Sequence, residues 1–232
     1  MTGEPIHRLQ EANAGRAEAL HALRHLPLKI RQGLTSGEYE IRRRSEGRFF
    51  EAIIYELLRS VAAAHGGIAR LAAWGADAPP PSKTKQGIRY SRDGGIRICS
   101  AGALAAEIDL LFADTEGRIY FGEAATTHPP PALFRAEVER KRALIRELAG
   151  EQPVHFLYIS PTQPPGGFAP LFTGGGSALV RPDLLCCIRE IADVAGSPRR
   201  RRQLPHDRVV DGSVFFQSPA AGGGYIQRFF RK

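Results

Sequence analysis

The stretch Glu107–Thr127 reads EIDLLFADTEGRIYFGEAATT and predicts two antiparallel strands joined by a tight turn. Apolar residues dominate both halves of the stretch. Between them, Thr115–Gly117 predicts a three-residue hairpin loop with glycine at its left-handed position. Counting outward from that loop, one residue at a time, pairs Asp109 with Glu123. The sequence therefore predicts two carboxylates facing each other on neighbouring strands.

Two facing carboxylates have a chemical consequence. Their Cβ atoms are expected about 4.5–5.5 Å apart, so either one carboxyl takes up a proton or a cation lies between them. Oxygen ligands at this spacing suit a hard divalent ion, Mg²⁺ or Mn²⁺. Glu107 is expected on the same face, opposite Ala125. A shift of one residue would separate Asp109 from Glu123, so an exposed sheet face with unrelated acids remains the alternative.

The sequence on either side of the hairpin predicts further helices and strands. Apolar residues at helical spacing predict a helix that contains Glu51 and ends at a Gly-Gly pair, and a second helix follows the hairpin. A Gly- and Pro-rich loop is expected over 161–178, where TGGGS lacks the lysine of a phosphate-binding loop. Helices are expected over 14–26, 42–65, 132–149 and 182–194, and strands over 88–90, 96–99, 106–113, 118–125, 154–160 and, weakly, 213–217.

This order of elements resembles the PD-(D/E)xK nuclease superfamily, over roughly residues 47–160. The family pattern is a helix with an internal glutamate, an acidic strand, an ExK strand, a helix and a further strand. The resemblance implies an α/β fold with a restriction-endonuclease-like core, a central mixed β-sheet flanked by helices, and extra segments at both ends. It also implies that Asp109 and Glu123 bind Mg²⁺ or Mn²⁺, with Glu51 as an auxiliary ligand.

The sequence departs from the family pattern at Ala125, where the ExK motif has lysine. Lys141 is the candidate replacement. It is the charged member of an otherwise apolar stripe on the following helix, between Val138 and Ile145. An inward lysine needs a negative partner, and Glu123 is the natural one. The alternative is that the stem of Lys141 lies on the apolar face while its amine reaches water.

The predicted function is a metal-dependent endonuclease that hydrolyses phosphodiester bonds of DNA. Its catalytic residues would be Glu51, Asp109, Glu123 and Lys141. One alternative is a catalytically inactive subunit that keeps the nuclease fold and binds nucleic acid or serves in assembly. A weaker alternative is a basic scaffold that binds RNA or protein, with the acids on its surface.

The net charge of +8 and the isoelectric point near 9.8 favour a nucleic-acid partner, DNA in preference to RNA. Two basic runs are the candidates for phosphate contacts, although such runs are usually solvated faces or linkers. These residues are Arg42, Arg43, Arg44, Arg199, Arg200, Arg201 and Arg202.

Composition also bounds the organisation of the chain. We expect a basic helical segment over 1–44, a nuclease-like α/β core over 45–196 and a basic extension over 197–232. The sequence shows no secretory signal and no apolar run long enough to span a membrane, and its three cysteines form no CxxC pair. These features predict a cytoplasmic protein without a membrane partner, and they leave the oligomeric state open, a homodimer included.

Overall fold

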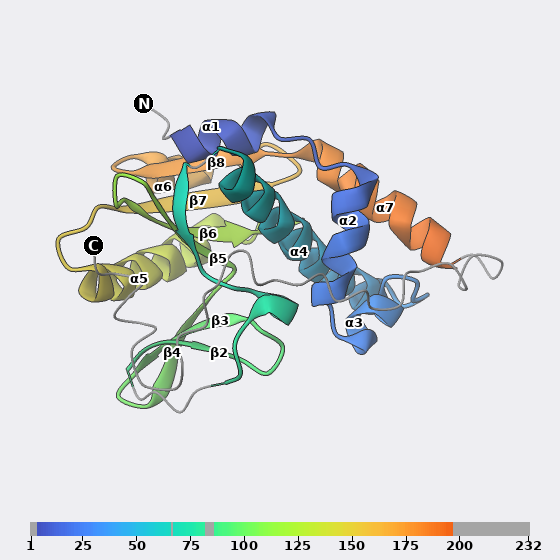
Figure 1. Ribbon diagram of the computed structural model, residues 1–232, viewed down its shortest axis with the longest axis horizontal. Helices are drawn as coiled ribbons and strands as arrows, with labels where there is room; N and C mark the ends of the chain where they lie inside the picture. Colours follow the sequence, from blue (N-terminus) through green and yellow to red (C-terminus); the bar gives the residue numbers. More distant parts are fainter. Residues whose placement is uncertain (1–3, 66, 82–85, 197–232) are drawn as a thin grey trace.

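The structure, a computed structural model, describes residues 4–65, 67–81 and 86–196 (Figure 1). These residues form an α/β fold with two sheets. A mixed sheet has the strand order β1-β5-β6-β7-β8, and a smaller antiparallel sheet has the order β2-β3-β4. The strands are β1 (Ile68–Leu71), β2 (Gly87–Tyr90), β3 (Ile96–Ser100), β4 (Ala103–Ile108), β5 (Leu110–Asp114), β6 (Ile119–Ala124), β7 (Val154–Ser160) and β8 (Gly176–Val180).

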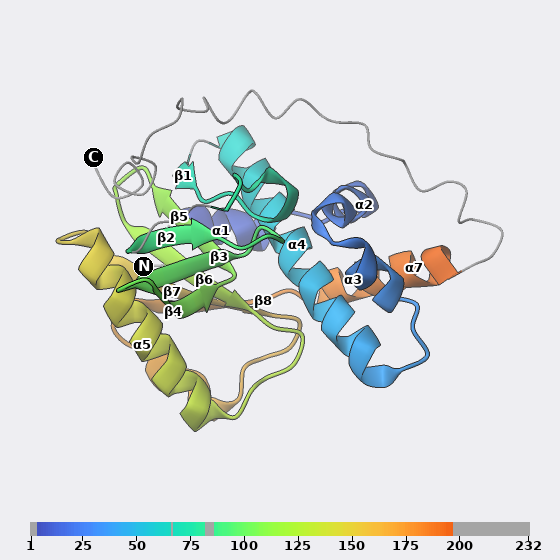
Figure 2. The ribbon, with the colours of Figure 1, turned by 90° about the horizontal axis from the view of Figure 1, so that it is seen from below.

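Helices flank the mixed sheet, as the sequence predicts. α4 packs against β1 and β6, and α5 packs against β7, with strands of the sheet between the two helices (Figure 2). All five residues of β5 are buried, so this strand is covered on both faces. The helices are α1 (Glu4–Glu11), α2 (Arg16–Ala22), α3 (Leu28–Gly33), α4 (Tyr39–His65), α5 (Pro131–Ala149), α6 (Ala169–Phe172) and α7 (Pro182–Gly196), with 3₁₀ turns at Leu23–His25, Gly75–Asp77 and Gly166–Phe168.

The predicted register of the hairpin is confirmed. β5 and β6 pair antiparallel, with Leu110 opposite Gly122, so the ladder continues toward Asp109 and Glu123. The turn closes with a 3.1 Å bond from the Asp114 N–H to the Arg118 carbonyl. Gly117, at the third position of the loop, has φ +79, which glycine adopts at no steric cost.

The single strand predicted over 106–113 is wrong, because the chain bends at Asp109 and changes sheets there. β4 pairs with β3 in the small sheet, and β5 pairs with β1 and β6 in the large one. Glu107 consequently does not lie opposite Ala125. It is paired instead with Arg97 on β3, with 2.7 Å between Arg97 Nε and Glu107 Oε1.

α4 organises the N-terminal half of the molecule. From Phe49 to Leu58 every residue except Glu51 is buried, so the middle of this helix is enclosed on all sides. α1, α2 and α3 all pack on α4, and α2 also packs on α7. Since α4 begins at Tyr39, the boundary predicted between residues 44 and 45 falls inside this helix.

The two edge strands of the large sheet, β1 and β8, were not predicted. β8 begins inside the segment that the sequence predicts as a loop, because its glycines resemble loop residues. The structure gives these glycines a steric reason: a Cβ at Gly176 would overlap the Leu171 carbonyl, and Gly175 has φ +104.

The weak strand over 213–217 and the basic run Arg199–Arg202 lie outside the described residues. No helix of the described ranges has the length and apolarity that a membrane crossing requires.

Candidate functional site

Lys141 on α5 contacts Glu123 at the end of β6. Its Nζ lies 2.7 Å from Glu123 Oε1 and 2.9 Å from Glu137 Oε1. The lysine side chain is only 4% exposed, so its amine does not reach open water. The predicted contact between Lys141 and Glu123 is confirmed, and the alternative in which the amine reaches water is excluded.

Asp109 lies beside the same end of β6. Its Oδ2 accepts a 2.9 Å hydrogen bond from the backbone N–H of Ala124, which ties the bend between β4 and β5 to the neighbouring strand. Burial raises the pKa of the Asp109 carboxyl, and the Ala124 N–H and the charge of Lys141 oppose that shift. Asp109 is therefore not a ladder residue opposite Glu123, as the hairpin register predicts, but lies at the bend, where its carboxylate is held beside the end of β6.

The pKa of Glu123 is raised to about 8. Burial is the largest cause, followed by the negative charge of Asp109, while Lys141 acts in the opposite direction. The positive charge of Lys141 therefore only partly offsets the burial and the negative charges that raise the pKa of Glu123. The Glu123 side chain is 13% exposed, so it is less deeply buried than the Lys141 side chain, which is 4% exposed.

Glu51 on α4 completes the acidic cluster. Burial and the charges of Asp109 and Glu123 raise its pKa, and Arg48 lowers it. Arg48 Nη1 lies 2.5 Å from Glu51 Oε2, and the Arg48 guanidinium stacks 4.9 Å from the centre of the Trp74 ring. The sequence did not identify Arg48 as a partner, although its i,i+3 spacing from Glu51 was a usable signal.

Ala125 follows β6 directly. Its N–H donates to the Ile159 carbonyl at 3.0 Å, so the backbone stays in line with β7 beyond the last strand residue. No lysine is present at this position, and the ammonium near Glu123 comes from α5 instead. Glu137, one turn before Lys141 on that helix, also contacts the ammonium and was not predicted.

The oxygen atoms of Asp109, Glu123 and Glu51 are the donors that could hold a divalent metal ion. Within residues 4–65, 67–81 and 86–196, however, no three His, Cys, Asp or Glu side chains are already grouped in an arrangement that would hold one. Mg²⁺ or Mn²⁺ binding therefore stays a prediction.

The predicted phosphate-contact residues divide into two groups. Arg42, Arg43 and Arg44 are exposed on the first turns of α4, and Arg43 Nη1 donates to Thr127 Oγ1 at 3.2 Å. Thr127 lies four residues after Glu123, so Arg43 contacts the segment that follows this acid. The second group, Arg199–Arg202, lies in the part of the chain that the structure does not describe.

No protein-family model matches this chain, and no curated protein matches its sequence. Any functional conclusion therefore depends on the geometry and chemistry of the site itself.

Proposed function

We propose that this protein is a divalent-metal-dependent nuclease that hydrolyses phosphodiester bonds of nucleic acid, DNA in preference to RNA. The observation that carries the proposal is the 2.7 Å ion pair between Lys141 and Glu123 beside Asp109. Two buried acids and a buried ammonium are costly to maintain unless they stabilise one another or serve a reaction. Their order along the chain also matches the resemblance to the PD-(D/E)xK superfamily, with the lysine moved to α5.

Asp109 and Glu123 would hold the metal ion, with Glu51 as an auxiliary ligand. Their oxygen atoms are the donor type that Mg²⁺ and Mn²⁺ prefer. When bound, the ion would activate a water molecule and neutralise charge on the phosphate. Arg48 would orient Glu51, because it contacts that carboxylate and is itself held by stacking on Trp74.

Lys141 would act on the transition state of hydrolysis. Its ammonium is fixed in a largely buried position, so little reorganisation is needed when negative charge grows on the phosphate. Glu137 would help to keep the amine protonated, since burial lowers the pKa of Lys141 while Glu123 and Glu137 raise it, with a net upward shift. At neutral pH the lysine is therefore a cation and not a base.

The test is cleavage of plasmid and single-stranded DNA in EDTA, in Mg²⁺ and in Mn²⁺. Asp109→Ala and Glu123→Ala should abolish metal-dependent cleavage while the circular dichroism spectrum stays that of the parent. Mg²⁺ should also raise the melting temperature of the parent, because an ion that binds only the folded state stabilises it. Both variants should lose that increase.

Glu107→Gln is the matched control. Glu107 is an acid of the same sequence stretch, but it lies in the small sheet and pairs with Arg97. This variant should cleave and respond to Mg²⁺ like the parent. Parent-like cleavage by Asp109→Ala or Glu123→Ala would show that the assignment of the metal ligands is wrong.

The second candidate is an inactive nuclease-fold subunit that binds nucleic acid or serves in assembly. It is favoured by the engagement of Glu51 with Arg48 and by the lack of a ready three-ligand group among the described residues. For this candidate, neither Mg²⁺ nor Mn²⁺ should change the melting temperature, and no DNA should be cut. Nucleic-acid binding in EDTA should nevertheless persist.

A further inference from the structure

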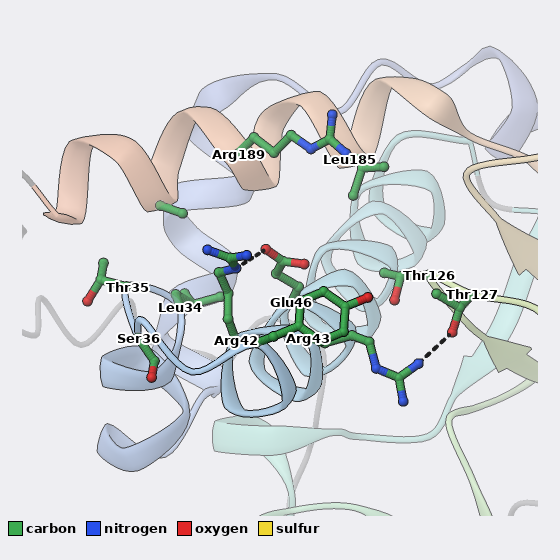
Figure 3. Close-up of a pocket in the computed structure, with 12 residues that line it drawn as sticks. Leu34, Thr35, Ser36, Arg42, Arg43, Glu46, Thr126, Thr127, Leu185 and Arg189 are labelled. Carbon is green, nitrogen blue, oxygen red and sulfur yellow. Dashed lines mark hydrogen bonds and ion pairs between the residues drawn. The ribbon is translucent and has the colours of Figure 1, made fainter.

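A hollow of about 810 Å³ lies between α4, α7 and the loop that joins α3 to α4. Figure 3 shows Arg189 on α7 across this hollow from Arg42 on α4, with Thr126 and Thr127 at one end. A second hollow of about 550 Å³ continues from it, because both are lined by Arg43, Thr126 and Thr127. We call the two together the α4–α7 groove.

The α4–α7 groove reaches the two chain segments that carry Glu51 and Glu123, although none of the three acids lines it. The second hollow is lined by Ala125, two residues after Glu123, and by Gly47, one helical turn before Glu51. A ligand that lies in the groove would therefore pass beside the residues that flank two of the three acids.

The lining of the groove carries an excess of positive charge. Its arginines are Arg42, Arg43, Arg44 and Arg189, and its acids are Glu40 and Glu46. The pairing inside the groove is loose: Arg42 Nε lies 3.9 Å from Glu46 Oε1, and Arg43 Nε lies 3.6 Å from Glu40 Oε2. Across residues 4–65, 67–81 and 86–196, Arg189 has no hydrogen-bond or ion-pair partner.

An aromatic side chain is exposed within this basic lining. Tyr39, the first residue of α4, is 63% exposed, whereas the other described tyrosines whose exposure is given, such as Tyr120 and Tyr158, are buried. Hydroxyl groups of Thr35 and Ser36 lie near it in the lining. An exposed aromatic ring among arginines is the combination with which proteins bind unpaired nucleotides, because bases stack on the ring and phosphates contact the cations.

We propose that the α4–α7 groove binds an unpaired strand of nucleic acid and delivers it to the carboxylate cluster. Tyr39 stacks on a base, and Arg42, Arg43 and Arg189 contact successive phosphates. The inference rests on the proposed nuclease function and narrows its substrate class to single-stranded nucleic acid. Duplex DNA is a poorer ligand, because paired bases keep their faces stacked inside the helix and cannot reach Tyr39.

The test measures fluorescence anisotropy of labelled oligo(dT), with an oligo(dA)·oligo(dT) duplex of equal length for comparison, in EDTA so that nothing is cut. The parent should bind the single strand at least about tenfold more tightly than the duplex. Tyr39→Ala should weaken single-strand binding by about tenfold, and Tyr39→Phe should bind like the parent. Arg189→Gln should weaken binding by severalfold and reduce its dependence on salt.

An abasic strand of the same length isolates the stacking contact. Tyr39→Ala should bind this strand as well as the parent does, because no base is present to stack, while Arg189→Gln should still bind it more weakly. Oligo(U) in place of oligo(dT) separates RNA from DNA as the source of the strand. Equal affinity for oligo(U) and oligo(dT) would show that the groove contacts the phosphate backbone and the bases and does not distinguish ribose from deoxyribose.

Two exposed residues of α5 serve as matched controls. Arg146→Gln removes the same charge as Arg189→Gln, and Leu133→Ala removes an exposed apolar side chain, outside the groove. Both should bind like the parent. Parent-like binding by Tyr39→Ala and Arg189→Gln, or a preference for the duplex, would overturn the proposal.

Binding in EDTA separates this proposal from the nuclease assignment. If Asp109→Ala and the parent bind oligo(dT) equally and neither cuts DNA in Mg²⁺, the groove stands and the nuclease function fails. If the parent cuts DNA and Tyr39→Ala and Arg189→Gln cut it with an unchanged KM, the nuclease function stands and the groove fails.

Discussion

Lys141 carries a positive charge at a buried position, where charged side chains are rare. Its neighbours on the same stripe of α5, such as Val138 and Ile145, are fully buried, and the lysine itself is 3% exposed. The ammonium is tolerated because Glu123 and Glu137 both contact it. Removing it would leave Glu123 without its cation, although that carboxyl can take up a proton because its pKa is already about 8.

Lys141→Met keeps the stem of the side chain and removes the ammonium. We expect the rate of DNA cleavage to fall by about a hundredfold or more, because charge on the transition state is no longer stabilised. The affinity for DNA in EDTA should change little. The free energy of unfolding should fall by about 1–3 kcal/mol, because a charged hydrogen bond is lost. Single-turnover kinetics and urea denaturation measure the two effects.

Ala125→Lys in the Lys141→Ala background is the companion experiment. Residues two apart in extended chain point to the same side, so a lysine at 125 would point to the side of Glu123. Ala125 lines the second hollow of the groove, where there is room for a longer side chain. Partial recovery of cleavage would support the view that the site needs an ammonium near Glu123, whether it comes from α5 or from position 125. Parent-like cleavage by Lys141→Met alone would refute the catalytic role.

Gly47 is a glycine inside a long helix, and the structure shows no steric need for it. A Cβ at this position would meet nothing closer than Thr126 Oγ1, at 3.9 Å. Gly47→Ala should therefore raise the free energy of unfolding by about 0.5–1 kcal/mol, the usual gain of alanine over glycine in a helix. Gly33→Ala is the contrast, since its Cβ would overlap Ser45 Oγ, and it should destabilise the protein by about 1–3 kcal/mol. Urea denaturation of the parent and of both variants measures these changes in the free energy of unfolding.

At the scale of elements, a buried polar network joins the N-terminal helices to α4. His25 Nε2 lies 2.5 Å from Glu56 Oε1, and His25 Nδ1 accepts a 3.1 Å hydrogen bond from the Ala76 N–H. The second bond requires an unprotonated Nδ1, so the neutral ring donates from Nε2 to Glu56. Arg24 and Arg59 also contact the Glu56 carboxylate.

This network predicts loss of stability in acid. Burial alone would raise the pKa of Glu56, but the hydrogen bond from His25 and the charge of Arg59 outweigh it and lower the pKa to about 2. A carboxyl with a lowered folded-state pKa stabilises the fold above its unfolded pKa, 4.5, and loses that contribution as pH falls toward 2. The contribution is about 3 kcal/mol. Burial also lowers the pKa of His25, so stability should begin to fall below 6.5.

Glu56→Gln tests this pH dependence. The free energy of unfolding, measured with urea between neutral pH and pH of about 3, should fall less steeply for Glu56→Gln than for the parent. Glu147→Gln, at an exposed position of α5, is the control and should keep the parent slope. Equal slopes for Glu56→Gln and the parent would mean that Glu56 titrates in the fold as it does in the unfolded chain.

At the scale of the whole molecule, the net charge of +8 is distributed between described and undescribed parts of the chain. The α4–α7 groove accounts for Arg42, Arg43 and Arg189, and the run Arg199–Arg202 lies outside the described residues. Electrostatic contacts with a phosphate backbone release counterions, so the slope of log affinity against log salt concentration reports the number of phosphate contacts.

Replacing Arg42, Arg43 and Arg189 by glutamine should reduce the slope of log affinity against log salt by about 2, at roughly 0.7 per single-strand phosphate. Neutralising Arg199–Arg202 should flatten the slope further, by up to about 3. Anisotropy titrations of oligo(dT) at several salt concentrations measure both. An unchanged slope for the Arg199–Arg202 variant would identify that run as a linker.

The features that depend on local spacing could be predicted from the amino-acid sequence. The hairpin turn at Thr115–Gly117, its register and the inward stripe of α5 with Lys141 were predicted, because turn chemistry and a period of 3.6 residues act over short stretches. Which distant elements meet depends on tertiary packing, which local patterns do not specify. It divided the predicted strand at Asp109, because the chain pairs with two different sheets on the two sides of that bend. It also brought α7 beside the first turns of α4, so Arg189 and Tyr39 line one groove although 150 residues separate them, a proximity set by packing that no local pattern encodes.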